Sequence, residues 1–207
     1  MVILYITRHG QTEWNLEKRM QGWLDSPLTI EGKEAAVALG ERLAQVPFKA
    51  CFASPSGRTV ETAQLICKNR SLPLLLADEL KEIHAGDWQG LTADAIEKQF
   101  PRAYHAYYHD TENYQSQGGE NFHQVLERAL CVIKTMQDTY AEDDAILLVT
   151  HAVVKKLIIC HFKNLPVQRV WDPPFIHGTS LTKIHLKKNG EATLELIGDT
   201  QHLKNTQ

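Results

Sequence analysis

The chain has 207 residues, a length that fits one domain and at most two. Hydrophobic residues make up 43% of it and charged residues 23%, so it can bury a large core and is not expected to be disordered. The formal net charge of −3 argues against a general nucleic-acid or membrane-surface binder. The apolar runs are far shorter than the roughly 18 residues needed to cross a bilayer.

The N-terminus and the cysteines predict the compartment. Segment 1–6 is apolar but has no basic region and no cleavage site, so it is not a signal peptide. The cysteines form no Cys-x-x-Cys pair and have apolar neighbours, as reduced core cysteines do; they are Cys51, Cys67, Cys131 and Cys160. We therefore expect a cytoplasmic protein.

In the first half of the chain, short apolar runs alternate with helical patterns. The run Val2–Ile6 predicts a strand buried on both faces. Thr29 suits the N-cap of a helix whose apolar residues recur every three or four positions up to Leu43. The elements expected after it are a strand at Cys51–Ala53, a helix over Thr59–Lys68 and an apolar run over Leu72–Ala77.

The second half continues this alternation. Thr92 is a candidate cap for a helix that ends before Pro101, and Asn121–Tyr140 carries the clearest amphipathic stripe. The remaining expected elements are a buried strand at Ala145–Val149, a helix at Val153–Phe162, and a hairpin of strands Ser180–Leu186 and Ala192–Ile197. The polar tail after Gly198 is expected to fray.

This order of elements predicts an α/β fold. Strands that alternate with helices favour a three-layer α/β/α sandwich with a mostly parallel central sheet, and the C-terminal hairpin indicates an antiparallel edge strand. No linker divides residues 1–207, so a single domain is expected. Ligands of such sheets bind beyond the carboxyl ends of the strands, which directs attention to the residues after Ile6 and Val149.

Histidines follow both of these strands. The first strand runs into Thr7-Arg8-His9-Gly10 and the second into Thr150-His151-Ala152. If the strands are neighbours, the two imidazoles share one pocket. The guanidinium of Arg8 matches a phosphate or a carboxylate, and Arg58, at a helix start, can add a second one. This set suits phosphoryl transfer to a neutral histidine, which needs no metal if these groups supply the positive charge.

The motifs around these residues resemble the histidine phosphatase superfamily, the group of the cofactor-dependent phosphoglycerate mutases. The segments that carry the resemblance occur in the family's order along nearly the whole chain. They are 4–15 with its Arg-His-Gly signature, Gln21-Gly22, 25–29, Gly32, 54–63, 80–83, 86–90, 118–120 and 149–151. A phosphoglycerate mutase-like fold is therefore expected.

The resemblance implies a role for each matching residue. His9 is implied as the phosphorylated nucleophile, and Arg8, Arg58 and His151 as ligands of the phosphoryl group. Glu82 is implied as the acid that protonates the leaving oxygen and the base that activates water. The residues implied to contact substrate are Asn15, Gln21, Gly22, Thr150 and Ala152. No metal ligand and no cofactor is implied.

Several members of the family remain open as interpretations. The chain resembles most closely the short bacterial broad-specificity phosphatases, which predicts a metal-independent phosphomonoesterase acting on small-molecule phosphate esters. An alpha-ribazole phosphatase and a cofactor-dependent phosphoglycerate mutase are the alternatives. A catalytically silent phosphate-binding module is an alternative of another class, although both His9 and Glu82 are present.

Residues about 83–120 are expected to form an inserted, lid-like segment. The segment is rich in tyrosine and poor in basic residues, which indicates an apolar leaving-group pocket built from Trp23, Trp88, Tyr104, Tyr107 and Phe175. His105 and His109 have a spacing that can bind zinc, but no further ligand is placed with them. No nucleic-acid or membrane partner is expected, and the chain is predicted to be a monomer or a weak homodimer.

Overall fold

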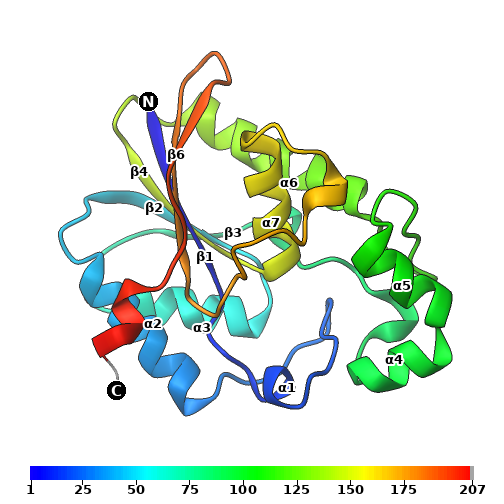
Figure 1. Cartoon of the computed structure of the whole chain (residues 1–207). Coiled ribbons are helices and arrows are strands. Elements are labelled where there is room, and N and C mark those ends of the chain that lie inside the picture. Colours follow the sequence, from blue (N-terminus) through cyan, green and yellow to red (C-terminus); the bar gives the residue numbers. More distant parts are fainter. Residues whose placement is uncertain (206–207) are drawn as a thin grey trace.

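The computed structural model describes residues 1–205 and contains a six-stranded sheet with strand order β3-β2-β4-β1-β5-β6 (Figure 1). The strands are β1 (Val2–Arg8), β2 (Phe48–Ala53), β3 (Leu74–Leu76), β4 (Ala145–Thr150), β5 (Leu181–Leu186) and β6 (Ala192–Asp199). Strands β1 to β4 pair in parallel, whereas β5 runs antiparallel to both of its neighbours. The mostly parallel sheet is confirmed, and its reversed strand lies one position in from the edge.

Helices cover both faces of the sheet, which gives the expected α/β/α sandwich (Figure 1). They are α1 (Glu13–Leu16), α2 (Ile30–Arg42), α3 (Gly57–Ile66), α4 (Ala93–Gln99), α5 (Pro101–His109), α6 (Phe122–Thr139) and α7 (Ala152–Phe162). Leu4 and Ile6 pack in the core beneath α6 and α7, while Tyr5 packs with α2 and α3 on the opposite face. The alternation of side chains along a strand therefore supplies two cores from one apolar run.

Side-chain caps fix the starts of the helices that the sequence marked. The Thr29 hydroxyl accepts a hydrogen bond from the Gly32 amide at the start of α2. Asn121 and Gln124 form a reciprocal capping box at the start of α6. No helix among residues 1–205 is both long and apolar enough to span a bilayer.

Helix α5 is not among the elements that the sequence predicts, because a proline after a helical pattern indicates the end of a helix. Helix α4 does stop before Pro101, but the proline then occupies the first turn of α5. Proline is well suited to that position because the amide it lacks has no partner within the helix. The sequence pattern thus marked a boundary between two helices rather than the end of one.

The prediction of a frayed C-terminal tail was wrong for most of its length. Strand β6 extends to Asp199, and residues 201–205 form a 3-10 turn that packs against α2. His202 is only 5% exposed, and its Nε2 lies 3.0 Å from the Thr179 hydroxyl. An ion pair between Arg42 and Asp199 holds the start of this turn. Polar side chains that are paired and buried therefore order the segment.

Candidate active site

The two histidines expected in one pocket are neighbours. Strands β1 and β4 pair in parallel with Arg8 opposite Thr150, so the next residue of each strand is a histidine at the same edge of the sheet. The ring centroids of His9 and His151 are 5.3 Å apart, and both side chains are buried. The structure thus brings together two residues that are 142 positions apart in sequence (151 − 9).

The hydrogen bonds of His9 leave one ring nitrogen available. Nδ1 lies 2.7 Å from the Gly10 carbonyl oxygen, which can only accept, so Nδ1 carries the proton and Nε2 holds a free lone pair. A Cβ at position 10 would lie 2.5 Å from the Gly32 carbonyl oxygen, so only glycine allows this turn. Burial and the nearby Arg8 and Arg58 charges lower the pKa of His9 well below 6.5.

We expect His9 to remain neutral at pH values well below 6.5. Because its pKa is lowered in the folded protein, the unfolded chain takes up the proton first as pH falls. His9 therefore contributes stability that is present above about pH 6.5 and is lost as pH falls below that value. Ring-nitrogen NMR, with His9→Asn to assign the signal, should show a neutral Nδ1–H tautomer at pH 6. A titration midpoint near 6.5 for this signal would contradict the expectation.

Arg8 presents most of its guanidinium to the pocket. Its Nη1 donates to the Ile176 carbonyl over 2.9 Å, and its Nε is buried with no partner. No carboxylate lies within ion-pair distance of Arg8 among residues 1–205. Burial lowers its pKa, with Glu82 acting in the opposite direction. An anion bound here would supply the missing charge and the missing acceptors.

Arg58, at the start of α3, is fixed in place by four acceptors. Its Nη1 donates to the Leu24 carbonyl over 2.7 Å and to Asp25 Oδ1 over 2.9 Å. Its Nη2 donates to the Gly22 carbonyl over 2.8 Å and to His151 Nδ1 over 3.2 Å. The side chain is buried and lines the pocket. Arg58 therefore adds positive charge at a fixed position.

The contact with Arg58 also sets the tautomer of His151. A guanidinium only donates, so Nδ1 of His151 accepts and its Nε2–H donates to the Ser54 hydroxyl over 2.8 Å. Burial and the Arg58 charge lower the pKa of His151 well below 6.5. Thr150 does not line the pocket, contrary to expectation, because its hydroxyl donates to the Leu80 carbonyl over 2.8 Å behind the site.

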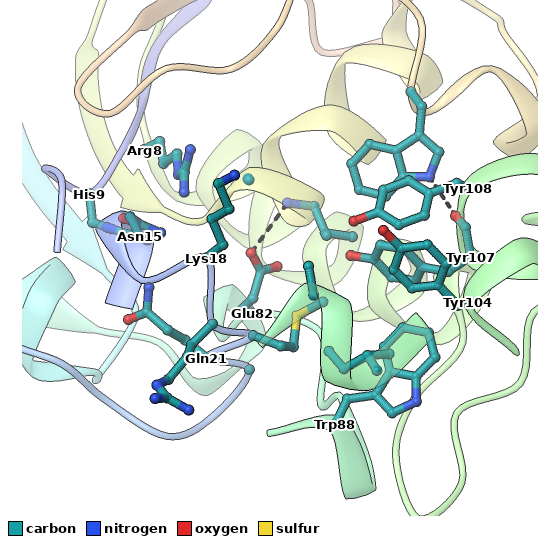
Figure 2. Close-up of a pocket in the computed structure, with 18 of the residues that line it drawn as sticks. Arg8, His9, Asn15, Lys18, Gln21, Glu82, Trp88, Tyr104, Tyr107 and Tyr108 are labelled. Atoms are coloured by element: carbon teal, nitrogen blue, oxygen red, sulfur yellow. Dashed lines mark hydrogen bonds between the residues drawn. The ribbon is translucent and has the colours of Figure 1, made fainter. Parts of the chain in front are cut away.

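A pocket of about 410 Å³ opens beside His9, and most of the expected contact residues line it (Figure 2). They are Arg8, His9, Asn15, Gln21, Gly22, Arg58, Glu82 and Ala152. The Asn15 Oδ1 accepts from the Thr12 amide over 3.1 Å, which leaves its NH₂ group for an anion. His151 lines an adjoining cavity of about 300 Å³ that shares Gly22 and Glu82 with the first.

Glu82 stands where the two cavities meet. Its Oε1 accepts from the Ile83 amide over 2.9 Å, and its Oε2 lies 3.4 Å from the Val153 amide in the first turn of α7 (Figure 2). The carboxylate thus lies between the cationic side of the pocket and the tyrosines of α5. This is a suitable place for a group that exchanges a proton with a leaving oxygen.

Arg128 of α6 was missed as a site residue, although it holds the backbone of Glu82. Its guanidinium donates to the carbonyls of Glu79, Lys81 and Glu82 over 2.7, 2.6 and 3.0 Å. It also forms a bidentate pair with Glu120, with distances of 2.8 and 2.9 Å. Glu120 belongs to one of the family motifs, but nothing in the motif spacing indicates that it pairs with Arg128 beside Glu82.

Replacing Arg128 with methionine should lower both stability and kcat. The change removes five hydrogen bonds and leaves the carboxylate of Glu120 unpaired, which should cost about 3 kcal/mol of unfolding free energy. A displaced Glu82 should lower kcat about tenfold at a temperature where the variant is folded. Urea titration and steady-state kinetics measure the two effects. Lys134→Met, an exposed position on the same helix, should change neither.

The aromatic residues expected in the pocket divide into two groups. Trp88, Tyr104, Tyr107 and Phe175 line it, and Phe175 is 69% exposed at its mouth. Trp23 does not; its ring contacts His84 and the Lys81 amine beside the adjoining cavity. The expectation that all five aromatic residues share one pocket was therefore wrong for Trp23.

The two histidines of α5 have no third side chain beside them that could complete a metal site in the described part of the chain. The rings of His105 and His109 lie 5.0 Å apart. Within the described part of the chain, no three or more His, Cys, Asp or Glu side chains gather in a way that could hold a metal ion.

Comparison with known proteins agrees with the geometry of this site. Residues 4–200 match the histidine phosphatase superfamily (branch 1). The chain belongs to this superfamily. Its sequence is 33% identical over 170 residues to the glucosyl-3-phosphoglycerate phosphatase of Mycolicibacterium vanbaalenii, covering 79% of this chain and 75% of that one. It is 30% identical to phosphoglycerate mutase-like protein 4 of Arabidopsis thaliana, covering 98% and 87% of the two chains.

Solved structures of the superfamily share the whole fold. Bacillus stearothermophilus YhfR is 41% identical, with a TM-score of 0.95 over 98% of this chain and 100% of that chain. The resemblance drawn from the sequence motifs and the phosphoglycerate mutase-like fold are both confirmed. These matches establish the family but assign no role to any single residue of this chain.

Proposed function

We propose that the chain is a metal-independent phosphomonoesterase that hydrolyses small-molecule phosphate esters through a phosphohistidine on His9. The observation that carries the proposal is the free Nε2 of a neutral His9 in a pocket that the guanidinium groups of Arg8 and Arg58 also line. A neutral imidazole is the nucleophilic form, and the cations favour the phosphoryl group that it attacks. Inclusion of phosphatases among the relatives supports the same class of reaction.

The reaction proceeds in two steps. In the first, Nε2 of His9 forms a bond to phosphorus while the bond from phosphorus to the ester oxygen breaks. Protonated Glu82 gives its proton to that oxygen, and the alcohol leaves. In the second step, the Glu82 carboxylate takes a proton from water, the resulting hydroxide attacks phosphorus, and the bond between phosphorus and Nε2 breaks. Arg8 and Arg58 stabilise the charge on the phosphoryl oxygens in both steps.

A mutase and a phosphatase differ in what accepts the phosphoryl group. The side chains that residues 83–120 place in the pocket include no basic group; they are Trp88, Ala93, Ile96, Tyr104, Tyr107 and Tyr108. A pocket wall without basic residues favours hydrolysis over the retention of a second phosphoglycerate. The phosphoglycerate mutase and the alpha-ribazole phosphatase stay as alternatives, as does the silent binding module.

Phosphate release tests the proposal directly. 4-Nitrophenyl phosphate and 3-phosphoglycerate are incubated with the protein in the presence of a chelator, and phosphoglycerate interconversion is followed in parallel. Release of phosphate supports a metal-independent phosphatase, and a wider panel of esters measures how broad the specificity is. Interconversion without release would assign a mutase, and binding without turnover would assign the silent module. The cytoplasmic location and the monomeric or weakly dimeric state stay predictions.

A further inference from the structure

The backbone that carries Arg8 and His9 is held by a short turn before β5. The Thr179 amide donates to the Arg8 carbonyl over 3.1 Å and to the His9 carbonyl over 3.4 Å. Three residues earlier, the Ile176 carbonyl accepts the hydrogen bond from Arg8 Nη1 over 2.9 Å. Segment 176–180, which we call the support turn, therefore contacts both the guanidinium and the backbone of the phosphoryl site.

The support turn lies against the backbone at His9 with no room for a side chain between them. A Cβ at Gly178 would lie 3.1 Å from the Gln11 amide nitrogen and 3.3 Å from the His9 carbonyl oxygen, which is tighter than ordinary contact. The two backbone segments thus pack directly on each other. A shift of the support turn would therefore displace the residue that we propose is phosphorylated.

Thr179 has a backbone conformation that is unfavourable for its residue type. Its φ of +56° lies in the left-handed region, where a β-branched residue is rarely found. Thr179 is also fully buried, so its hydroxyl needs a hydrogen-bond partner inside the protein. Such strain persists only where the surrounding contacts impose the conformation, and it is often found beside active sites.

The side chain of His202 is the partner of the Thr179 hydroxyl. Nε2 of His202 lies 3.0 Å from that hydroxyl, whereas its Nδ1 is buried with no partner among residues 1–205. Burial lowers the pKa of His202 to about 4, so the ring is neutral at physiological pH. A buried imidazole with an unpaired nitrogen is unfavourable, and a hydrocarbon ring at this position would avoid that cost. The contact with Thr179 gives the imidazole a reason to be there.

Lys155 of α7 fixes the other end of the support turn. Its fully buried amine donates to the Ser180 carbonyl, and it also donates to the Ser180 hydroxyl over 3.2 Å. That hydroxyl donates in turn to the His177 carbonyl over 2.8 Å. Lys155 thus anchors Ser180, and the hydroxyl of Thr179 has no side-chain partner other than His202 within the described part of the chain.

We propose that His202 is a positioning residue of the phosphoryl site. Through its hydrogen bond to Thr179 it keeps the support turn, and thereby Arg8 and His9, in the geometry that phosphoryl transfer requires. The C-terminal turn of residues 201–205 then affects the reaction without touching the substrate. The inference rests on the proposed function for the transfer step, whereas the placement of Arg8 and His9 can be tested without turnover.

Two substitutions remove the hydrogen bond from its two ends. His202→Phe keeps a planar ring and Thr179→Val keeps the β-branched shape, so each removes the contact with little change of volume. Each variant should lower kcat/KM for 4-nitrophenyl phosphate about three- to tenfold at a temperature where it is fully folded, because small displacements of reacting groups reduce rates strongly. The double variant should show no further loss, since both residues act through one bond. His202→Gln, whose amide can bond to Thr179, should restore most of the rate.

Two further readouts do not depend on turnover. Calorimetry should show that His202→Phe binds methylphosphonate about threefold more weakly, because Arg8 is less well placed. The ring-nitrogen NMR signals of His9 should shift in His202→Phe and return toward the wild-type position in His202→Gln. Gln137→Met is the control for stability, since its buried amide donates to the Lys187 carbonyl in the β5–β6 hairpin. This control should lower stability and leave both readouts unchanged.

The outcomes separate a positioning role from a purely structural one. Wild-type kcat/KM, methylphosphonate affinity and His9 signals in folded His202→Phe would overturn the proposal, whatever the melting temperature of the variant. Losses that multiply in the double variant would also overturn it, because the two residues would then act independently. If the wild-type protein hydrolyses no ester, the binding and NMR comparisons still decide whether His202 places Arg8 and His9, and only the proposed reaction is rejected.

Discussion

Replacing His9 with alanine is expected to lower the rate of phosphate release by about 10⁴-fold or more. The change removes the atom to which the phosphoryl group is transferred, so the phosphohistidine can be neither formed nor hydrolysed. Removal of a nucleophile commonly reduces an enzyme to the residual catalysis that binding and charge stabilisation provide. Phosphate release from 4-nitrophenyl phosphate, compared with the wild type at equal concentration, measures the effect.

A covalent intermediate distinguishes loss of the nucleophile from loss of folding. Rapid quenching of the wild type with radiolabelled substrate should trap an acid-labile phosphoryl group on the protein, and His9→Ala should trap none. The variant should still bind methylphosphonate, because Arg8 and Arg58 are unchanged. His105→Ala, on the exposed face of α5, is the matched histidine control and should behave as the wild type. Full activity of His9→Ala would exclude His9 as the nucleophile.

The pairing of the two histidines was predictable because two simple rules combine in it. His9 and His151 each follow a short apolar run that predicts a strand. Neighbouring parallel strands bring the residues at their carboxyl ends to the same edge of the sheet. Glu82 could not be found in this way, since it lies in a segment without regular structure and only the family resemblance selected it. The local sequence pattern thus identified the site residues that lie at the ends of strands. It did not identify Glu82, which lies in a loop.

The remaining differences come from contacts between distant parts of the chain. The hydrogen bonds from Arg128 to the carbonyls of Glu79, Lys81 and Glu82 join segments more than 40 residues apart, and no sequence periodicity predicts them. The ordered turn around His202 depends in the same way on Thr179 and Arg42. The tyrosines of α5 were noted from composition, but their orientation toward the pocket requires the helix that Pro101 begins. Composition indicated the aromatic wall of the pocket, but it could not show in which direction the tyrosine hydroxyls point.

Replacing Glu82 with glutamine should lower kcat by an amount that depends on the leaving group. The amide keeps the size of the side chain but cannot give a proton to the ester oxygen or take one from water. General acid–base groups typically contribute about 10²- to 10⁴-fold to the rate. An alkyl ester such as 3-phosphoglycerate, whose alkoxide is a poor leaving group, should show the larger loss. 4-Nitrophenyl phosphate, whose phenolate leaves without a proton, should lose less in its first step.

The pre-steady state separates the two tasks assigned to Glu82. With 4-nitrophenyl phosphate, Glu82→Gln should form the phosphohistidine at nearly the normal rate and hydrolyse it slowly, because no base activates the water. A burst of nitrophenolate equal to the enzyme concentration, followed by a slow phase, is the expected result. With an alkyl ester the first step is itself slow, so no burst should appear. Equal losses for both esters with no burst for either would show that Glu82 positions the substrate without transferring a proton, and the acid would then have to be sought among the other groups that line the pocket.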